Sequence, residues 1–430
     1  MDLYIGLLGC GTVGAGVVSL VRRRAGKVAD MTGSRPVVKT ILVRDTTKDR
    51  GVPFEHERLT TNPDDVLHDD AIQVVVETIG GIEPAKTYIL EALKRKKHVV
   101  TANKDLIAVH GPEILRVAAE NRVSVLFEAA VGGAIPLVGP LKENLTANEV
   151  TDLKGIINGT TNFILSEMTA RHIDFEEALA MAQELGYAEA DPSSDVDGLD
   201  AARKLVILSS IGFQTQVHLS DVRVEGIRHI TATDVRYADE LGYVIKLLAV
   251  GRDRGGELTL AVRPTLIPKV HPLAHVSDAY NALYVRGDAA GDLMFFGRGA
   301  GRMPTASAVV GDIISLIRNL KLGYVVSSPN GGAATTKPVV DREDERYKYY
   351  FRLLAQDQPG VFASIAQLFG ENHASMETVL QKRVRGSCAE IVIVTHDISS
   401  SKARRMIADL KALEHLHAVE CVMPVEPVAE

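Results

Sequence analysis

A chain of 430 residues is too long for one ordinary hydrophobic core, so we expect about two to four domains. The net charge of −7 argues against a general nucleic-acid or anionic-membrane binder, and no run approaches the ~18 apolar residues of a membrane span. Three cysteines, Cys10, Cys388 and Cys421, are far apart and odd in number, which favours a reducing compartment. We therefore expect a cytoplasmic protein that binds neither nucleic acid nor membrane.

The first motif in chain order is rich in glycine. The apolar run Leu3–Leu8 predicts a buried strand, and a helical pattern follows, so that G-x-G-x-x-G joins a strand to a helix. The motif covers Gly9, Gly11, Thr12, Val13 and Gly14. Its glycines allow a tight turn and the close approach of a pyrophosphate, whose charge suits a helix N-terminus. An ordinary turn would have the same letters, but the position directly after the first strand favours dinucleotide binding.

The second predicted strand, Val37–Val43, bears on the choice of cofactor. It ends in Arg44 and not in the acidic residue that would bond a ribose 2′-hydroxyl. An arginine suits a 2′-phosphate, so NADP is favoured over NAD. Asp45 follows one place later and keeps NAD possible. Lys48 is the only other cation that we expect nearby.

Strands and helices continue to alternate as far as residue 136, which predicts a doubly wound parallel sheet. The predicted elements are the strands Ile72–Glu77, His98–Thr101 and Val123–Phe127 and the helices Pro84–Lys94 and Pro112–Asn121. Lys104 comes directly after one of these strands, and open α/β sheets bind ligands at the carboxyl ends of their strands. Lys104 is therefore a candidate ligand residue, although a solvated loop lysine is the alternative.

From residue 137 the pattern changes to that of an α+β domain with an antiparallel sheet. The run Ile156–Leu165, IINGTTNFIL, predicts a turn between apolar stretches, and Phe295–Pro304 predicts a second glycine loop before a helix at Thr305–Leu320. The strands that we expect are Val222–Ile227, Lys246–Asp253, Leu258–Leu266 and Ala282–Gly287.

The most informative stretch runs from Leu185 to Lys204. It is apolar on nearly every face after Lys204, which predicts a buried helix with Asp200 and Lys204 on the same side. We expect six carboxylates to surround this lysine: Glu184, Glu189, Asp191, Asp195, Asp197 and Asp200. An exposed Asp–Lys pair is the ordinary alternative. The chemical hypothesis is a partly buried pair whose carboxylates hold a cationic group, with Lys204 placed to move a proton.

The C-terminal part follows a segment, Ser327–Lys348, whose composition predicts a linker. Beyond it the predicted order is β-α-β-β-α-β, a ferredoxin-like module. Its predicted elements are Tyr349–Gln356, Val361–Glu371, Glu377–Arg383, Glu390–His396, Ser401–Ala412 and Ala418–Pro424.

Five motifs together resemble homoserine dehydrogenase with a C-terminal ACT domain, in the family's order and over essentially the whole chain. They read GLLGCGTVG, VVTANKDLIAVHG, GIINGTTNFIL, LGYAEADPSSDVDGLDAARK and GRGAGRMPTASAVVGDI. The resemblance implies NAD(P)-dependent interconversion of L-homoserine and L-aspartate 4-semialdehyde, on the path to threonine, methionine and isoleucine. It implies a Rossmann-type domain at 1–136 completed by a helix from about 301–320, a catalytic and dimerisation domain at 137–326, a linker at 327–348 and an ACT domain at 349–430.

The resemblance also implies roles for individual residues. Lys204 corresponds to the family's proposed proton donor and Asp200 to its partner. The implied substrate-binding residues are Glu189, Asp195, Gly159 and Lys104. The implied cofactor contacts are Thr12, Val13, Arg44, Lys104 and Gly301, beside the glycines of the first motif. A sodium ion, or another monovalent cation, is implied at Glu128, Val131, Gly133 and Ile135.

An ACT domain implies regulation by an amino acid, most directly L-threonine, and a homo-oligomer, either a dimer or a tetramer. The turn at 357–361 resembles the ACT ligand loop, whereas Asn372–Ser375 departs from the commonest family pattern. A module that only stabilises a dimer is the alternative. For the whole chain the rival hypothesis is a nucleotide-binding amino-acid sensor without catalysis. The intact Asp200–Lys204 pair, with Glu189, argues against it.

Overall fold

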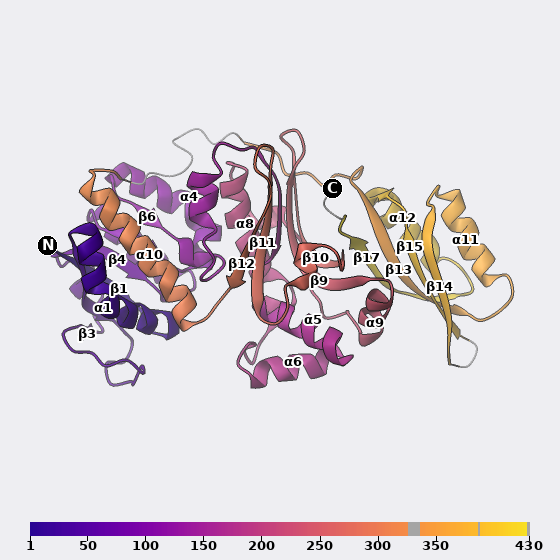
Figure 1. Ribbon diagram of the computed structural model, residues 1–430, viewed down its shortest axis with the longest axis horizontal. Coiled ribbons are helices and arrows are strands. Elements are labelled where there is room, and N and C mark those ends of the chain that lie inside the picture. The colour runs from indigo at the N-terminus through magenta and orange to yellow at the C-terminus, as the bar shows by residue number, and fades with distance from the viewer. Residues whose placement is uncertain (326–335, 386–387, 428–430) are drawn as a thin grey trace.

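The computed structural model describes residues 1–325, 336–385 and 388–427, which form an elongated molecule with one sheet of six strands and one of eleven. The six-stranded sheet lies at one end of the long axis (Figure 1). The larger sheet occupies the middle and runs on into the C-terminal module at the other end. Within the described residues, no helix combines the length and the apolar character needed to cross a bilayer.

The N-terminal sheet is parallel throughout and has the order β3-β2-β1-β4-β5-β6. This order is that of doubly wound dinucleotide-binding sheets, so the predicted α/β fold is confirmed. The strands are β1 (Asp2–Leu8), β2 (Arg35–Leu42), β3 (Arg58–Thr60), β4 (Ile72–Glu77), β5 (His98–Thr101) and β6 (Val125–Leu126). The helices around them are α1 (Thr12–Thr32), α2 (Asp64–Leu67), α3 (Ala85–Lys94) and α4 (Lys104–Asn121).

Helix α4 begins earlier than the sequence predicted. The expected start was Pro112, but the helix starts at Lys104 and contains this proline. The side chain of Asn103 accepts a hydrogen bond from the Leu106 N–H at 3.1 Å and so caps the helix. The cap places Lys104 in the first turn, at the carboxyl edge of the sheet.

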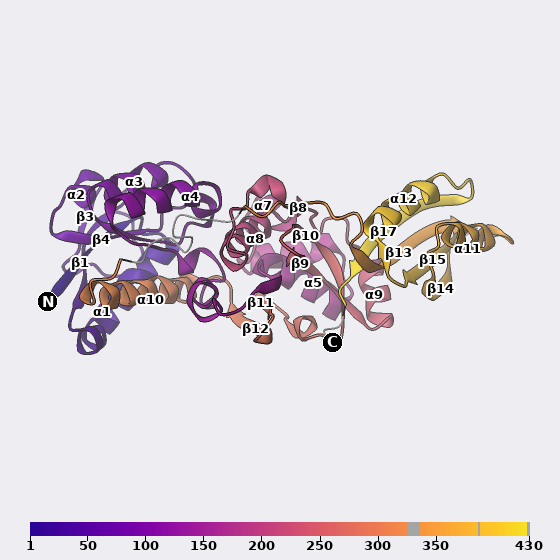
Figure 2. The ribbon, with the colours of Figure 1, turned by 90° about the horizontal axis from the view of Figure 1, so that it is seen from above.

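Helix α10 (Arg302–Lys321) belongs to this end of the molecule although it comes late in the chain. It lies alongside α1, as Figure 2 shows, and Val309 and Ile313 share a core with Val17 and Val21. Gly16 permits the close crossing, because a Cβ at that position would lie 2.7 Å from the Arg302 carbonyl oxygen.

The middle of the molecule holds an antiparallel sheet in the order β12-β11-β7-β9-β10, as predicted. Its strands are β7 (Val150–Ile156), β8 (Arg223–Val224), β9 (Tyr243–Asp253), β10 (Leu258–Pro268), β11 (Tyr280–Gly287) and β12 (Gly291–Arg298). Two helices, α5 (Gly159–Arg171) and α8 (Leu199–Gly212), pack on this sheet. The remaining helices are α6 (Phe175–Glu184), α7 (Ser193–Val196) and α9 (Ala232–Glu240).

Three local predictions in this region were wrong. The strand expected at Val222–Ile227 is reduced to the two residues of β8. The turn expected within Ile156–Leu165 is the start of α5, because Asn158 caps a helix there. The predicted glycine loop at Phe295–Pro304 shrinks to residues 299–301, because Phe295 to Arg298 pair with β11.

The C-terminal module has the strand order β17-β13-β15-β14, which confirms the predicted ferredoxin-like arrangement. One face of its sheet is covered by its own two helices, which share a core with Phe351 and Leu353. The elements are β13 (Arg346–Gln356), α11 (Val361–Glu371), β14 (Met376–Arg385), β15 (Cys388–Thr395), β16 (Ile398–Ser399), α12 (Ser400–Lys411) and β17 (Leu416–Val425).

The opposite face of this module packs directly on the middle of the molecule. Arg352 of β13 meets Asp234 of α9 at 2.7 Å, and the Tyr237 hydroxyl donates to Glu390 at 2.8 Å. The two sheets become one where Leu266 of β10 pairs with Val425 of β17. The module is therefore joined to the middle of the molecule by direct contacts and a shared sheet, and not by the chain alone.

The predicted linker is itself largely structured where it is described. Residues 327–335 lie outside the described part of the chain. After them, Leu258 of β10 exchanges hydrogen bonds with Pro338 and Val340, and β13 already begins at Arg346.

Candidate active site

Asp200 and Lys204, one turn apart on α8, form a pair that is largely buried. The Lys204 Nζ lies 2.7 Å from Asp200 Oδ2 and also donates to the Ile157 carbonyl oxygen at 2.8 Å. Asp200 is 2% exposed, so the ordinary alternative of a surface ion pair does not apply. The buried helix predicted from Leu199 is present, and its polar residues stand at its first turns.

A second lysine, at the start of α4, reaches the same carboxylate from the N-terminal domain. Lys104 Nζ lies 2.5 Å from Asp200 Oδ1. Next to this contact, Arg203 of α8 pairs with Asp105 of α4 at 3.2 Å. The first turns of α4 and α8 are therefore joined by two ion pairs. In one of them α4 supplies the cation, and in the other α8 supplies it. The two pairs fix the position of α4 relative to α8.

The charges at this junction shift one another's proton affinity. Burial alone would raise the pKa of Asp200, but Lys204 and Lys104 outweigh it and hold this pKa well below its usual range. Burial works against the charge of Lys104, but Asp200 raises the pKa of this ammonium above its ordinary value. Lys104 is therefore a cation at neutral pH.

Asn158 connects the parts of the site, although sequence reasoning did not select it. Its side-chain oxygen accepts the Thr161 N–H at 2.8 Å and so caps α5. Its amide nitrogen donates to Asp200 Oδ2 at 2.8 Å and to Asp195 Oδ1 at 2.6 Å. An asparagine between a strand and Gly-Thr-Thr is a helix-capping signal. That signal could have revealed the start of α5, but not the contacts with the two carboxylates.

The expected ring of six carboxylates around Lys204 was wrong. Among the described residues, Asp195 and Asp200 are the two that converge on Asn158. Burial and the charge of Asp200 raise the pKa of Asp195 above its ordinary value, although the hydrogen bond from Asn158 works in the other direction. Of the other four, Asp197 pairs with Arg228, Asp191 accepts the Ser193 N–H, and Glu184 and Glu189 are exposed.

The two remaining predicted substrate residues lie on the same side of the site. Gly159 is the first residue of α5, and a Cβ there would lie 2.9 Å from the Ala279 carbonyl oxygen. Glu189 lies on the loop after α6, which is held to α5 by a hydrogen bond from Thr160 to the Tyr187 carbonyl oxygen at 2.7 Å. The structure thus brings Gly159, Asp195 and Asp200 together, while Glu189 lies on exposed surface two residues from a contact with α5.

The glycine motif lines a cavity of about 840 Å³ at the carboxyl edge of the parallel sheet. Gly9 has a φ of +92°, and a side chain on Gly14 would overlap the Gly9 carbonyl oxygen. This turn leaves the backbone of Gly11 and Thr12, at the start of α1, open to the cavity. Val13 and Gly14 support the turn from within α1. The open backbone of the turn and the size of the cavity fit a dinucleotide.

Four cations surround this cavity: Arg44, Lys48, Arg50 and Arg302. The expectation that Lys48 is the only cation near Arg44 was therefore wrong. Arg302 is the first residue of α10, 252 residues after Arg50 in sequence, and directly follows Gly301, whose φ is +123°. The carboxylate of Asp45 accepts hydrogen bonds from the backbone N–H and the hydroxyl of Thr47 at 2.8 and 2.7 Å. Both hydrogen bonds go to Oδ1.

The four residues of the implied cation site lie on one irregular segment after β6. The Glu128 carboxylate accepts three backbone N–H groups, those of Leu137, Val138 and Gly139, at 2.6 to 2.8 Å. Gly132 and Gly133 both have positive φ, so the chain reverses between Val131 and Ile135. A carboxylate and backbone carbonyls are hard oxygen donors and suit a hard cation. The described residues hold no cluster of three or more His, Cys, Asp or Glu side chains that would favour a softer metal.

Three family models match this chain. One is the NAD-binding domain of homoserine dehydrogenase, over residues 9–128, and another is homoserine dehydrogenase itself, over residues 136–314. The third is the ACT domain, over residues 349–415. The matches follow the order and the positions of the motifs in the sequence.

Whole proteins match over nearly the full length. The homoserine dehydrogenase of Bacillus subtilis is 43% identical over 426 residues, covering 99% of this chain and 98% of its own length. That of Synechocystis sp. is 45% identical over 436 residues, covering 99% and 100%. A homoserine dehydrogenase structure from Thiobacillus denitrificans superposes with a TM-score of 0.93 at 41% identity, covering 99% of this chain and 98% of its own.

A more distant structure is a hyperthermophilic archaeal homoserine dehydrogenase in complex with NADPH. It has a TM-score of 0.64 at 25% identity, and the match covers 76% of this chain and all of the archaeal one. The nucleotide cavity, the Asp200 junction and the C-terminal module thus occur on a chain that matches its relatives from end to end. Residues, fold and relatives agree that this chain belongs to the homoserine dehydrogenase family of NAD(P)-dependent oxidoreductases.

Proposed function

We propose that L-homoserine and L-aspartate 4-semialdehyde are interconverted where Lys104 and Lys204 meet Asp200. One observation carries this proposal: two lysines, one from α4 and one from α8, converge on one buried carboxylate at 2.5 and 2.7 Å. Lys104 stands at the carboxyl edge of the sheet that holds the nucleotide cavity. Asn103, the N-cap of α4, donates a hydrogen bond to the Gly81 carbonyl oxygen at 2.7 Å. Gly81 belongs to the loop that begins with the cavity residues Thr78 and Ile79. The junction therefore lies between cofactor and substrate.

Lys204 is the proposed acid and base. Two of the three N–H groups of its ammonium are directed to Asp200 and Ile157, which leaves one for a substrate oxygen. In the oxidation of homoserine, neutral Lys204 takes the hydroxyl proton, and in the reverse direction its ammonium gives a proton to the aldehyde oxygen. The bound nicotinamide supplies the hydride acceptor or donor. Lys104 keeps its charge next to Asp200 and stabilises negative charge on the reacting oxygen.

The ammonium group of the substrate requires carboxylates that are not already neutralised. Asp195 supports this role, because Asn158 holds it beside Asp200 and no ion pair to a lysine or arginine is present among the described residues. Gly159 leaves room at this point, since a side chain would meet Ala279. Glu189 on the neighbouring loop completes the proposed ammonium site.

For the cofactor we propose a preference for NADP. The cations Arg44, Lys48 and Arg50 line the cavity next to the end of β2, where a 2′-phosphate would lie, while the Asp45 carboxylate is engaged by Thr47. The NADPH in the archaeal relative is consistent with this choice. Val13 and Gly301 complete the proposed cofactor contacts from the starts of α1 and α10.

Arg44→Ala is expected to raise KM for NADP by roughly tenfold or more, because a charge-assisted hydrogen bond contributes about 1.5–3 kcal/mol. KM for NAD should change little. Initial rates with both cofactors measure the effect. Arg58→Ala is the matched control, because Arg58 is exposed on β3 and pairs with Asp65 outside the cavity. An equal rise of KM for NAD and NADP would contradict the assignment.

We propose that a monovalent cation, preferably sodium, binds to the Glu128 carboxylate and the carbonyl oxygens of Val131, Gly133 and Ile135. The reversal of the chain at two positive-φ glycines supports it. We expect sodium chloride, compared with choline chloride at equal ionic strength, to raise the midpoint of thermal unfolding. Glu128→Gln should abolish the difference between the two salts. A wild-type midpoint that is the same in both salts would count against a bound cation.

The C-terminal module is proposed to bind L-threonine at the turn before α11. Gly360 caps this helix with a φ of +93°; the Val361 N–H donates to the Gln358 carbonyl oxygen at 3.3 Å, and the next N–H groups of the first turn are the ones proposed to receive a carboxylate. Ala363→Glu places a negative charge in the first turn and is expected to relieve inhibition by threonine, whereas Ala363→Gln should not. Activity against threonine concentration measures both. Equal inhibition of the two variants would contradict the site, and an unresponsive wild type would favour a purely structural module.

Deleting the module would not test threonine binding alone, because the deletion would expose Asp234 and Tyr237, which are buried against it.

We also propose a homo-oligomer, at least a dimer. β12 is the outer strand of the larger sheet, and Met294 and Phe296 are exposed on it. Sedimentation velocity distinguishes a monomer from a dimer or tetramer.

A cytoplasmic location is proposed from the three free cysteines.

A further inference from the structure

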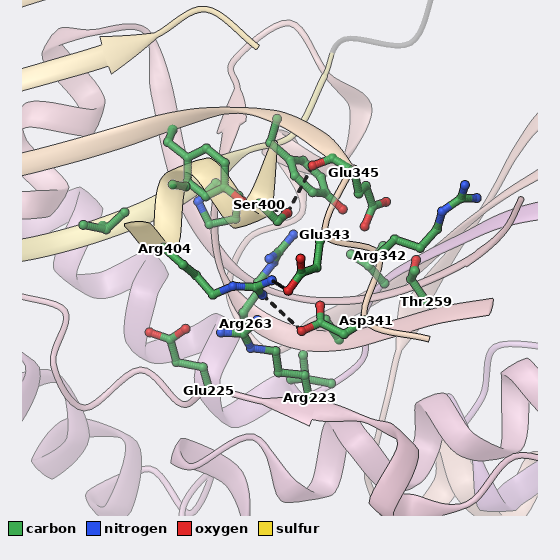
Figure 3. A pocket seen from close by; sticks show the side chains of 18 of the residues that line it. Arg223, Glu225, Thr259, Arg263, Asp341, Arg342, Glu343, Glu345, Ser400 and Arg404 are labelled. Carbon is green, nitrogen blue, oxygen red and sulfur yellow. Dashed lines mark hydrogen bonds and ion pairs between the residues drawn. The ribbon is translucent and has the colours of Figure 1, made fainter. Parts of the chain in front are cut away.

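A cavity of about 950 Å³ lies between the C-terminal module and the middle of the molecule, apart from both the Asp200 junction and the turn before α11. Its walls come from β8 and β10 on one side and from β13, β17 and α12 on the other, and residues 339–345 close one end. Figure 3 shows its polar side chains. The volume is in the range of small-molecule sites.

The carboxylates that line this cavity already have partners. Asp341 and Glu343 accept Arg404 at 3.1 and 3.4 Å (Figure 3). The other contacts are Glu345 with Arg252 at 2.7 Å, Glu225 with His229 at 3.3 Å, Glu420 with Arg352 at 3.9 Å, and Asp221 with the backbone N–H of His218 at 2.7 Å. Each of these carboxylates therefore has a hydrogen-bond or ion-pair partner, although Asp341 and Glu343 share one arginine and the partner of Asp221 is uncharged.

Two of its arginines, by contrast, lack an acidic partner. Among the described residues, neither Arg223 of β8 nor Arg263 of β10 forms an ion pair. Arg263 also has a fully buried Nε with no hydrogen-bond acceptor. The Nε atom has no accessible surface, so a ligand in the cavity would meet the guanidinium at its two terminal nitrogens.

The surroundings of Arg263 hold its guanidinium in place without neutralising it. The guanidinium lies 4.8 Å from the centre of the Tyr347 ring, which also carries Arg252 at 4.9 Å. Arg252 is compensated by Glu345 and Glu426, at 2.7 and 3.1 Å. Of the two arginines over the Tyr347 ring, Arg263 is the one without a carboxylate partner among the described residues, so its charge is available to a ligand.

Part of the remaining lining is apolar. Partly exposed side chains of β10, α12, β17 and the segment before β13 contribute Ala261, Ile407, Val422, Val339 and Val340. A fixed guanidinium beside an apolar wall matches a molecule with a carboxylate at one end and a hydrocarbon body at the other. Inorganic phosphate would leave the apolar wall without a partner.

We propose that this cavity is a binding site for a small carboxylate with an apolar body, whose carboxylate forms a bidentate contact with Arg263 while Arg223 lies at the same wall. The site is separate from the reaction and from the proposed threonine site. Because its two walls belong to different parts of the chain, a bound ligand ties the C-terminal module to β10.

The test is isothermal titration calorimetry on the full chain with three probes. 3-Methylbutanoate carries the carboxylate and the apolar body, L-leucine adds an ammonium group, and inorganic phosphate offers an anion without an apolar body. Each is titrated into the wild type, Arg263→Gln and Arg405→Gln. Arg405 is the control, because it is an exposed arginine of α12 that does not line the cavity.

We expect 3-methylbutanoate or L-leucine to bind the wild type and Arg405→Gln equally, and Arg263→Gln at least tenfold more weakly. Whichever of the two binds more tightly defines whether the ligand carries an ammonium group. If Arg263→Gln does not fold, Arg223→Gln replaces it, with a weaker but measurable loss expected. Binding of phosphate alone, binding that neither variant weakens, or no binding of any probe would overturn the proposal.

Discussion

Lys204→Ala is expected to lower kcat by roughly 10²–10⁴-fold, the usual contribution of a general acid or base. Cofactor affinity and folding should stay close to those of the wild type. The reason is geometric: Lys104 still compensates the buried Asp200 at 2.5 Å, so the variant leaves no unpaired charge behind. Initial rates of NADP reduction by homoserine, followed at 340 nm, give kcat.

Lys94→Ala is the matched control for this experiment, because Lys94 is an exposed lysine at the end of α3 without a role at the junction. It should keep wild-type kcat. If Lys204→Ala retained more than about a tenth of wild-type kcat, the proton would have to move through another group. Lys104 would then be the first residue to examine.

Glu426→Gln is expected to destabilise the chain by about 3–5 kcal/mol, the cost of removing one partner from a buried ion pair. Glu426 is 2% exposed and lies 2.7 Å from Lys154 and 3.1 Å from Arg252, so it joins the end of β17 to the middle sheet. The substitution keeps the shape of the side chain but leaves Lys154 without its buried counter-charge. Urea unfolding, followed by tyrosine fluorescence, measures the change.

Glu414→Gln provides the comparison, because Glu414 is an exposed acid of the same module. It should unfold within about 0.5 kcal/mol of the wild type, as surface substitutions usually do. The two variants carry the same change of charge, so the difference between them isolates burial. Unfolding free energies of the two variants that agree within error would show that the contact between module and sheet is not held by this ion pair.

The parts of the fold that the sequence predicted are those specified by short-range patterns. G-x-G-x-x-G after the first strand, alternating strands and helices, and the β-α-β-β-α-β order each depend on neighbours in the chain. Docking of α9 against Arg352 and Glu390 depends on residues far apart in sequence and left no local signal. The same holds for Arg302, which lines the nucleotide cavity although 252 residues separate it from Arg50 in sequence.

The candidate site shows the same limit. Spacing on one helix predicted that Asp200 and Lys204 would share a face, and both are found in contact. Asn158 was missed, because its capping role is readable in the sequence while its contacts with Asp195 and Asp200 require the folded sheet. The prediction that the whole acidic loop surrounds Lys204 was wrong, because Asp197 pairs with Arg228 and Asp191 accepts the Ser193 N–H.

The central claim is that Lys104 and Lys204 work as one unit through Asp200, and a double-mutant cycle on kcat tests it most directly. Lys104→Ala, Lys204→Ala and the double variant are compared with the wild type at saturating homoserine and NADP. Residues that act as a unit are strongly non-additive. We predict that the double variant loses no more than about tenfold beyond the slower single variant. A loss equal to the product of the two single losses would contradict the claim, because the lysines would then act independently.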